Sequence, residues 1–373
     1  MKKLFYIAVA AMAMAACAKT EVSQNLNNAI SFMPANQQTT KVTGSVFPQD
    51  QTFGTYAWTE GTAGEYFIEN KEVSFDATAN IWSTETPYYW PKNQTVDFFS
   101  YYPFNVEGTV PTVEKTQITY NGIDFTAKQV DLMYADKAVG YTDNANQVED
   151  GQNAFEGVPT IFRHAGAKLK VNVILGENEK TEAVTGTVTK WTVVLKQVVL
   201  SGLYTKGSCV LTLSSTDNGI IPWNKPVDAE GYNVWTPDAT APTNDEDNTL
   251  YKDVQNRNLV KGEGQLVIPE IYVLPQTLVA DQQKIALTVD ITTYRKLQGE
   301  TDFTEVLTQT DKVVSADLLI DTGSLNTSVF AWQMNQAVTY NITLGPAGKQ
   351  ITFDPAVDAW EAKTYSTNID LDI

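Results

Sequence analysis

The chain has 373 residues, of which 43% are hydrophobic and 19% are charged, so it can bury a sizeable core and is long enough for two domains. Its 26 basic and 44 acidic residues give a net charge of −18, which argues against nucleic acid as a partner because two polyanions repel each other. The single histidine excludes a histidine-rich metal site and leaves one candidate for a catalytic triad.

The first residues are typical of a secretion signal. Lys2 and Lys3 precede an uninterrupted apolar run over 4–16, which is too short to span a bilayer but suits a signal peptide. The run ends in Met14-Ala15-Ala16-Cys17, and small residues before a cysteine are typical of the lipobox of bacterial lipoproteins. We therefore expect a signal peptide over residues 1–16 and a lipid on Cys17, with ordinary secretion and an incidental cysteine as the alternative.

The mature chain begins with a strand pattern. Over Glu21–Met33 the apolar residues fall on even positions, and the odd positions are mostly polar. This period of two predicts a strand with one buried face, and Pro34 is expected to end it. The small, polar residues 35–40 follow, and then Lys41.

Most of the remaining chain alternates in the same way. Clear strand patterns cover residues 168–173, 285–292 and 338–344, and helical periodicity is scarce. Strands separated by polar turns that contain glycine or proline predict an all-β fold of antiparallel sandwiches. The polar, acidic stretch Tyr141–Val158 is expected to separate two domains.

Three features could carry chemistry, and each has a structural interpretation. Cys209 shares a predicted strand face with leucines, which favours a buried, inert thiol over a nucleophile. His164 has no nucleophile motif nearby, so we expect a structural residue at the domain interface. The acidic cluster Asp245–Asp247 lacks the spacing of an EF-hand loop, and we expect a solvated loop. The sequence thus predicts no catalytic residue, no metal site and no cofactor.

An aromatic group in the first half also has two interpretations. It could form a platform for stacking sugars, but we expect it to pack in the core and between domains, because aromatic residues supply much of a sandwich's buried area. The group consists of Tyr88, Tyr89, Trp90, Phe98, Phe99, Tyr101 and Tyr102.

The last residues form the most regular strand pattern. Apolar residues and threonine at odd positions alternate strictly with Ser366, Asn368, Asp370 and Asp372. Because chain termini usually fray, such a strand calls for a partner sheet, which could lie in its own domain or in another molecule. The odd positions are Tyr365, Thr367, Ile369, Leu371 and Ile373.

Six phrases in order, together with the lipobox, resemble the fimbrillin superfamily, the lipoprotein subunits of type V pili. The resemblance covers most of the mature chain. The phrases lie at residues 30–32 (ISF), 89–91 (YWP), 96–103 (VDFFSYYP), 130–135 (VDLMYA), 162–169 (FRHAGAKL) and 274–276 (LPQ).

The resemblance implies two transthyretin-like β-sandwich domains in tandem. It implies a propeptide with a removable first strand over residues 17–41, an N-terminal domain over 42–158 and a C-terminal domain over 159–373. It also implies that a trypsin-like protease removes the first strand, and that a strand from another subunit then fills the apolar groove left behind.

The sequence offers residues for each of these steps. Lys41-Val42, in an exposed polar loop, is our candidate cleavage site, although the family's best-known pattern has arginine there; an uncut loop is the alternative. Residues 365–373 are the candidate donor strand, with Tyr365, Ile369, Leu371 and Ile373 as the residues to be buried.

The expected function is therefore a non-enzymatic subunit of an adhesive fimbria. Its partners would be other fimbrial subunits, the outer membrane through the lipid before cleavage, a trypsin-like protease, and a host or glycan receptor. One alternative is a monomeric surface lipoprotein that binds glycan or host protein. Another is a surface glycosidase, but no motif indicates a pair of carboxylates.

Overall fold

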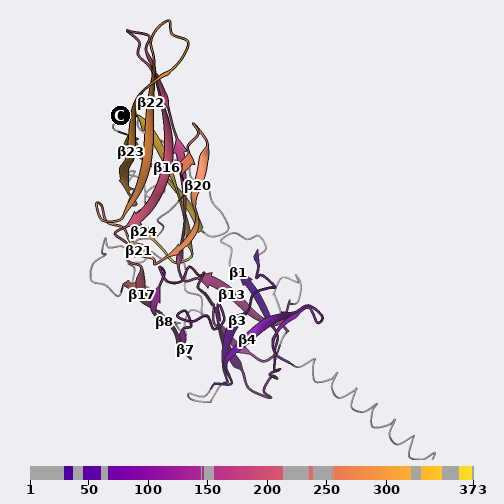
Figure 1. The fold of residues 1–373 in the computed structure, drawn as a ribbon. Coiled ribbons are helices and arrows are strands. Elements are labelled where there is room, and N and C mark those ends of the chain that lie inside the picture. The colour runs from indigo at the N-terminus through magenta and orange to yellow at the C-terminus, as the bar shows by residue number, and fades with distance from the viewer. Residues whose placement is uncertain are drawn as a thin grey trace, which may run out of the picture.

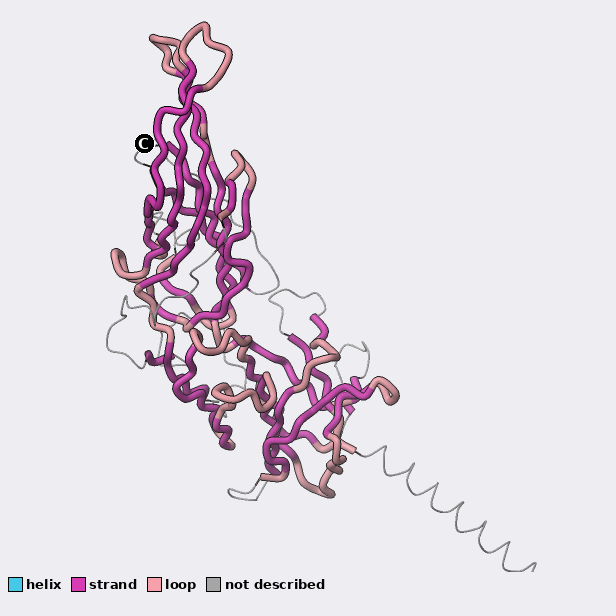
Figure 2. Tube along the Cα trace, in the orientation of Figure 1, coloured by secondary structure: helices cyan, strands magenta, loops and turns pink. Residues whose placement is uncertain are grey.

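The computed structural model describes residues 29–36, 45–59, 66–143, 145–146, 155–212, 235–237, 254, 256–320, 329–346 and 361–371. Every helix or strand assigned in these ranges is a β-strand (Figures 1 and 2), so the predicted all-β class is confirmed. None of these residues belongs to a helix that is long and apolar enough to cross a membrane.

A nine-stranded sheet in the first half of the chain closes on itself. Its strands follow the order β10-β6-β3-β4-β5-β1-β13-β9, β9 also pairs with β6, and β2 lies beside β1. The strands are β1 (Phe32–Asn36), β2 (Ser45–Val46), β3 (Phe53–Thr59), β4 (Ile68–Asp76), β5 (Ile81–Thr84), β6 (Val96–Tyr102), β9 (Met133–Ala135), β10 (Ala138–Tyr141) and β13 (Val158–His164).

A small four-stranded sheet packs beside the closed sheet and combines strands from distant parts of the chain. The order is β18-β17-β8-β7, so β8 and β17 form its centre. Its strands are β7 (Thr112–Glu114), β8 (Gln117–Asp124), β17 (Lys206–Thr212) and β18 (Trp235–Pro237).

The second half forms a tall sandwich of two sheets (Figure 1). One sheet has the order β20-β14-β25-β26, with β14 (Ala167–Leu175), β20 (Gly264–Val273), β25 (Gln336–Pro346) and β26 (Glu361–Leu371). The other has the order β15-β16-β22-β23, with β15 (Glu179–Thr181), β16 (Val188–Ser201), β22 (Lys284–Lys296), β23 (Thr304–Asp317) and, beside β16, β19 (Arg257–Asn258). Two short pairs complete the fold, β11 (Ala145–Asn146) with β12 (Phe155–Glu156) and β21 (Gln276–Thr277) with β24 (Ala331–Trp332).

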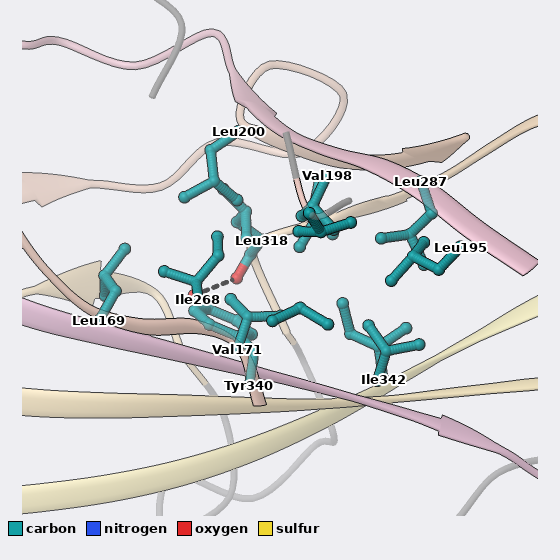
Figure 3. Packing of buried hydrophobic residues seen from close by; sticks show 14 of the residues in the cluster. Leu169, Val171, Leu195, Val198, Leu200, Ile268, Leu287, Leu318, Tyr340 and Ile342 are labelled. Carbon is teal, nitrogen blue, oxygen red and sulfur yellow. Dashed lines mark hydrogen bonds between the residues drawn. The ribbon is translucent and has the colours of Figure 1, made fainter. Parts of the chain in front are cut away.

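The predicted alternation places the sandwich core correctly. Residues of β14 alternate between buried and half-buried along the whole strand, and so do those of β22 up to Tyr294. Their inward faces meet between the two sheets (Figure 3), where the Tyr340 hydroxyl donates a hydrogen bond to the Leu318 carbonyl oxygen at 2.8 Å. Trp332 Nε1 donates to the Tyr340 oxygen at 2.9 Å, so this buried hydroxyl is satisfied on both sides.

The prediction that Pro34 ends the first strand is wrong, because β1 continues to Asn36. Ser31 O accepts a hydrogen bond from Val158 N, whereas Ile30 N donates in the other direction to Tyr88 O. Successive residues of a strand therefore face opposite neighbours, and the nitrogen of Pro34 points away from β13. On that side β5 pairs with Phe32 and β2 pairs with residues 35–36, so no ladder bond is lost at Pro34.

Two pairings cross the expected domain boundary near residue 158. β13, which begins at Val158, lies in the closed sheet between β1 and β9. β17, which follows the expected boundary, pairs with β8, which precedes it, in the small sheet.

Three strand pairings, β1 with β13, β14 with β25, and β25 with β26, are parallel, whereas the sequence predicted antiparallel sheets. Parallel neighbours need a long connection, and local alternation does not reveal it.

Candidate functional site

The first described strand, β1, fills a central place in the closed sheet. Ile30 and Phe32 are 2% and 3% exposed and belong to the core that this sheet encloses. The Phe32 ring makes edge-to-face contacts with Phe53 and Phe98, at centroid distances of 5.9 Å and 5.7 Å. Removing β1 would therefore open the sheet between β5 and β13 and expose an aromatic floor.

The two sides of β1 are held differently. On one side it pairs with β13 in parallel over five residues, Phe32 to Asn36. On the other side only Phe32 pairs with β5, opposite Trp82. Gly157 lies against the Phe32 backbone, where an added Cβ would come within 2.9 Å of the Phe32 carbonyl carbon. Any strand that takes this position therefore has to pair mainly with β13.

One ion pair and one side-chain hydrogen bond hold β13 on its far side. Arg163 is 1% exposed and binds both carboxylate oxygens of Asp136, through Nε at 2.5 Å and a terminal nitrogen at 2.8 Å. His164 Nδ1 lies 2.8 Å from Asp131 Oδ1. Bidentate charge-assisted bonds are strong and directional, so β13 is held to its neighbourhood independently of β1.

His164 has the structural position that the sequence predicted. It is 8% exposed, and its main-chain nitrogen donates to Asn335 Oδ1 at 3.4 Å, in the turn that leads into β25. It thus lies where the closed sheet meets the sandwich.

The residues predicted for lipidation and cleavage lie outside the described ranges. These are Cys17, Lys41 and Val42. The segment 37–44, which contains Lys41 and Val42, joins β1 to β2, and β2 pairs with the end of β1.

The predicted C-terminal strand exists as β26 and pairs in parallel with β25 of its own chain. In this register Tyr365 is opposite Tyr340, Ile369 is opposite Leu344, and Leu371 is opposite Pro346. Ile373 lies outside the described residues. β26 is the last strand of its sheet, so its other edge is unpaired within the part of the chain that the structure describes.

The aromatic group packs mainly in the core, as expected. Trp90 and Phe98 are buried in the core of the closed sheet, and Tyr88 and Tyr102 are partly buried against it. Phe99 and Tyr101 are buried in a second cluster, together with residues of the small sheet. Only Tyr89, at 42%, is exposed. This burial leaves one exposed ring rather than a platform for sugars.

Cys209 is buried, as predicted for an inert thiol. It is 1% exposed, and burial raises the pKa of its thiol to about 12. Within the described ranges, no cluster of three or more histidine, cysteine or acidic side chains could hold a metal ion. The predicted acidic loop at Asp245–Asp247 lies outside these ranges.

Sequence reasoning missed the partner of β1. The sequence assigns residues 159–164 of β13 to the start of a second domain, and the parallel pairing of β13 with β1 leaves no local signal. Gly157 was the one available hint, because a glycine before a strand is typical of a close backbone approach.

A family model described as fimbrillin-like matches residues 40–360. Among solved structures, a candidate cell adhesion protein from Bacteroides uniformis ATCC 8492 is 15% identical with a TM-score of 0.41, over 86% of this chain and 95% of that one. Another from Parabacteroides distasonis ATCC 8503 is 14% identical with a TM-score of 0.42, over 92% and 95%. A fimbrial protein from Bacteroides ovatus ATCC 8483 is 11% identical with a TM-score of 0.30, over 91% and 51%. No curated protein matches the chain.

Proposed function

Because the chain belongs to the fimbrillin-like family, we propose that it polymerises into a fimbria by exchanging β-strands with its neighbours. The family is structural rather than enzymatic, and the chain is a fimbrial or adhesion subunit of the cell surface. In the proposed pathway Cys17 carries the lipid that holds the secreted precursor in the outer membrane. A trypsin-like protease then cuts Lys41-Val42, and β1 leaves.

The position of β1 is the observation that carries this proposal. β1 completes a closed sheet, yet it is joined to the rest of that sheet through the short segment that contains Lys41. Its loss would leave β13 with an unpaired edge above the rings of Phe53 and Phe98. Such an edge recruits another strand, since main-chain hydrogen bonds supply affinity and apolar pockets supply register.

The C-terminal strand is the proposed donor. At about 1.5–3 kcal/mol for each buried side chain, Ile30 and Phe32 together contribute roughly 3–6 kcal/mol to β1. Four apolar donor residues would contribute roughly 6–12 kcal/mol before the cost of ordering the strand. In the exchange, these contacts and the new main-chain hydrogen bonds would have to replace the pairing of β26 with β25 of its own chain. These donor residues are Tyr365, Ile369, Leu371 and Ile373.

The first test is the N-terminus and size of the surface-extracted protein. Cleavage and exchange predict an N-terminus at Val42 and a ladder of high mass on an unboiled denaturing gel, which collapses on boiling. Lys41→Ala should abolish both results. Lys71→Ala, an exposed lysine on β4, is the matched control and should change neither.

A second variant separates cleavage from exchange. Deleting residues 365–373 should leave the N-terminus at Val42 but remove the ladder. An acylated Cys17 at the N-terminus together with only a monomer band would contradict polymerisation, and would instead support a monomeric surface lipoprotein that binds glycan or host protein.

A further inference from the structure

A third hydrophobic cluster lies between the closed sheet and the small sheet, and the segment that leaves β20 of the sandwich contributes to it. β3 and β6 contribute Tyr56 and Tyr101, β17 contributes Cys209, and the segment after β20 contributes Leu274, which is fully buried. A single apolar core therefore draws on the closed sheet, the small sheet and the segment that follows β20 of the sandwich.

Gln129, in the segment after β8, reaches across this region. Its Oε1 accepts a hydrogen bond from Tyr272 N at 2.9 Å, and its Nε2 donates to Tyr272 O at 3.1 Å. Nε2 also donates to Phe125 O, at the base of its own segment. The carboxamide thus binds both main-chain groups of a residue in β20, as a neighbouring strand would.

Gln276, in β21, binds a main chain in the same way. Here the glutamine follows β20 of the sandwich, and the main chain that it binds is that of Tyr204. Its Oε1 accepts from Tyr204 N at 3.0 Å, and its Nε2 donates to Tyr204 O at 2.9 Å and to Leu274 O at 3.0 Å. Tyr204 lies in the link that leaves β16 of the sandwich and enters β17 of the small sheet. Gln276 is only 7% exposed, so all three bonds are shielded from water.

We propose that Gln129 and Gln276 fix the angle between the closed sheet and the sandwich, so that the two move as one rigid body. Both contacts lie beyond the same end of the small sheet, where Asp124 of β8 is opposite Lys206 of β17, and the two carboxamides replace strand pairing where no strand continues. Tandem domains joined by a linker move relative to each other by default, and here the shared core and the two clamps remove that freedom. This inference is independent of strand exchange.

Hydrogen exchange tests each clamp at a single amide. Removing the acceptor in Gln129→Ala should accelerate exchange of the Tyr272 amide by about fivefold or more, since a net hydrogen bond contributes about 1 kcal/mol. Gln276→Ala should do the same for the Tyr204 amide. Gln265→Ala is the matched control, because its Nε2 donates to Asn258 O within the sandwich, and it should leave both amides unchanged.

The angle itself is measured by the distance between two spin labels. In the full chain carrying Cys17→Ser, labels at Ala77→Cys in the β4–β5 turn and Ala280→Cys in the β21–β22 turn report on the two bodies, while Cys209 is buried. We expect one narrow distance distribution in this chain and with Gln265→Ala, and a broad one with Gln129→Ala and Gln276→Ala combined.

Two results would overturn the proposal. One is a broad distribution in the chain with intact glutamines, and the other is an unchanged narrow distribution when both are replaced. If the double variant does not fold, Gln129→Ala alone decides, because Gln129 is exposed and its loss opens no cavity.

Discussion

At the scale of single residues, Gly157 shows how closely the chain packs around β1. Its φ of +145° suits glycine, and the Phe32 backbone leaves no space for a side chain. We expect Gly157→Ala to lower the free energy of unfolding by roughly 1–3 kcal/mol and to make the segment around β1 more sensitive to protease. Gly108→Ala is the control: its φ is +77°, but nothing lies within 4 Å, so only the smaller backbone cost of about 1 kcal/mol applies. Equal effects of the two substitutions on unfolding would contradict the close contact.

Cys209 gives a second prediction for a single residue. Burial raises the pKa of its thiol from the ordinary 9.0 to about 12, so the unfolded chain loses this proton at lower pH than the folded one. The contribution to stability is complete below pH 9 and is lost as the pH rises towards 12. In the chain with Cys17→Ser, alkylation should be slow in the native state at pH 8 and fast in denaturant, and Cys209→Ala should flatten the loss of stability above pH 9. Rapid alkylation of the native protein would show that the thiol is accessible.

At the scale of whole elements, the sandwich depends on one hydroxyl that links three of its segments. Tyr340 on β25 accepts from Trp332 and donates to the Leu318 carbonyl, and Trp332 and Tyr340 are fully buried. Tyr340→Phe leaves that donor and that acceptor unpaired, and should cost about 2 kcal/mol or more in a denaturant titration. Tyr294→Phe, on the half-buried outer face of β22, should cost much less. Similar midpoints for the two variants would show that the buried hydroxyl contributes little.

Elements were predictable from the sequence where their pattern is local. The alternation over 168–173, 285–292 and 338–344 identified β14, β22 and β25 and their inward residues, because one face of each strand must be buried. The pairing of β1 with β13, and of β8 with β17, depends on residues far apart in the chain, and no local pattern encodes it. The prediction that the strand ends at Pro34 is wrong for a related reason. Whether the missing N–H of Pro34 costs a hydrogen bond depends on the strands beside β1, which the local sequence does not reveal.

At the scale of the whole molecule, we expect the net charge to slow the association of subunits. The net charge is −18 for the full chain and −21 without residues 1–41, which contain four lysines and one glutamate, so identical subunits repel each other. Salt shortens the range of that repulsion from about 30 Å at 0.01 M to about 8 Å at 0.15 M. Polymerisation of the cut protein, followed by light scattering, should therefore be faster at the higher salt concentration. A decrease in rate with salt would indicate that oppositely charged surfaces guide the encounter instead.

The parallel pairing of β1 with β13 has a consequence for the fibre that we propose. A strand that takes the place of β1 and keeps its hydrogen bonds must run in the same direction as β13. By strand exchange, each subunit would then insert into the next with one fixed orientation, in a head-to-tail contact that does not close into a symmetric pair. The polymer would be polar: one end presents an open acceptor, the other a free donor, and growth and attachment to the cell belong to opposite ends.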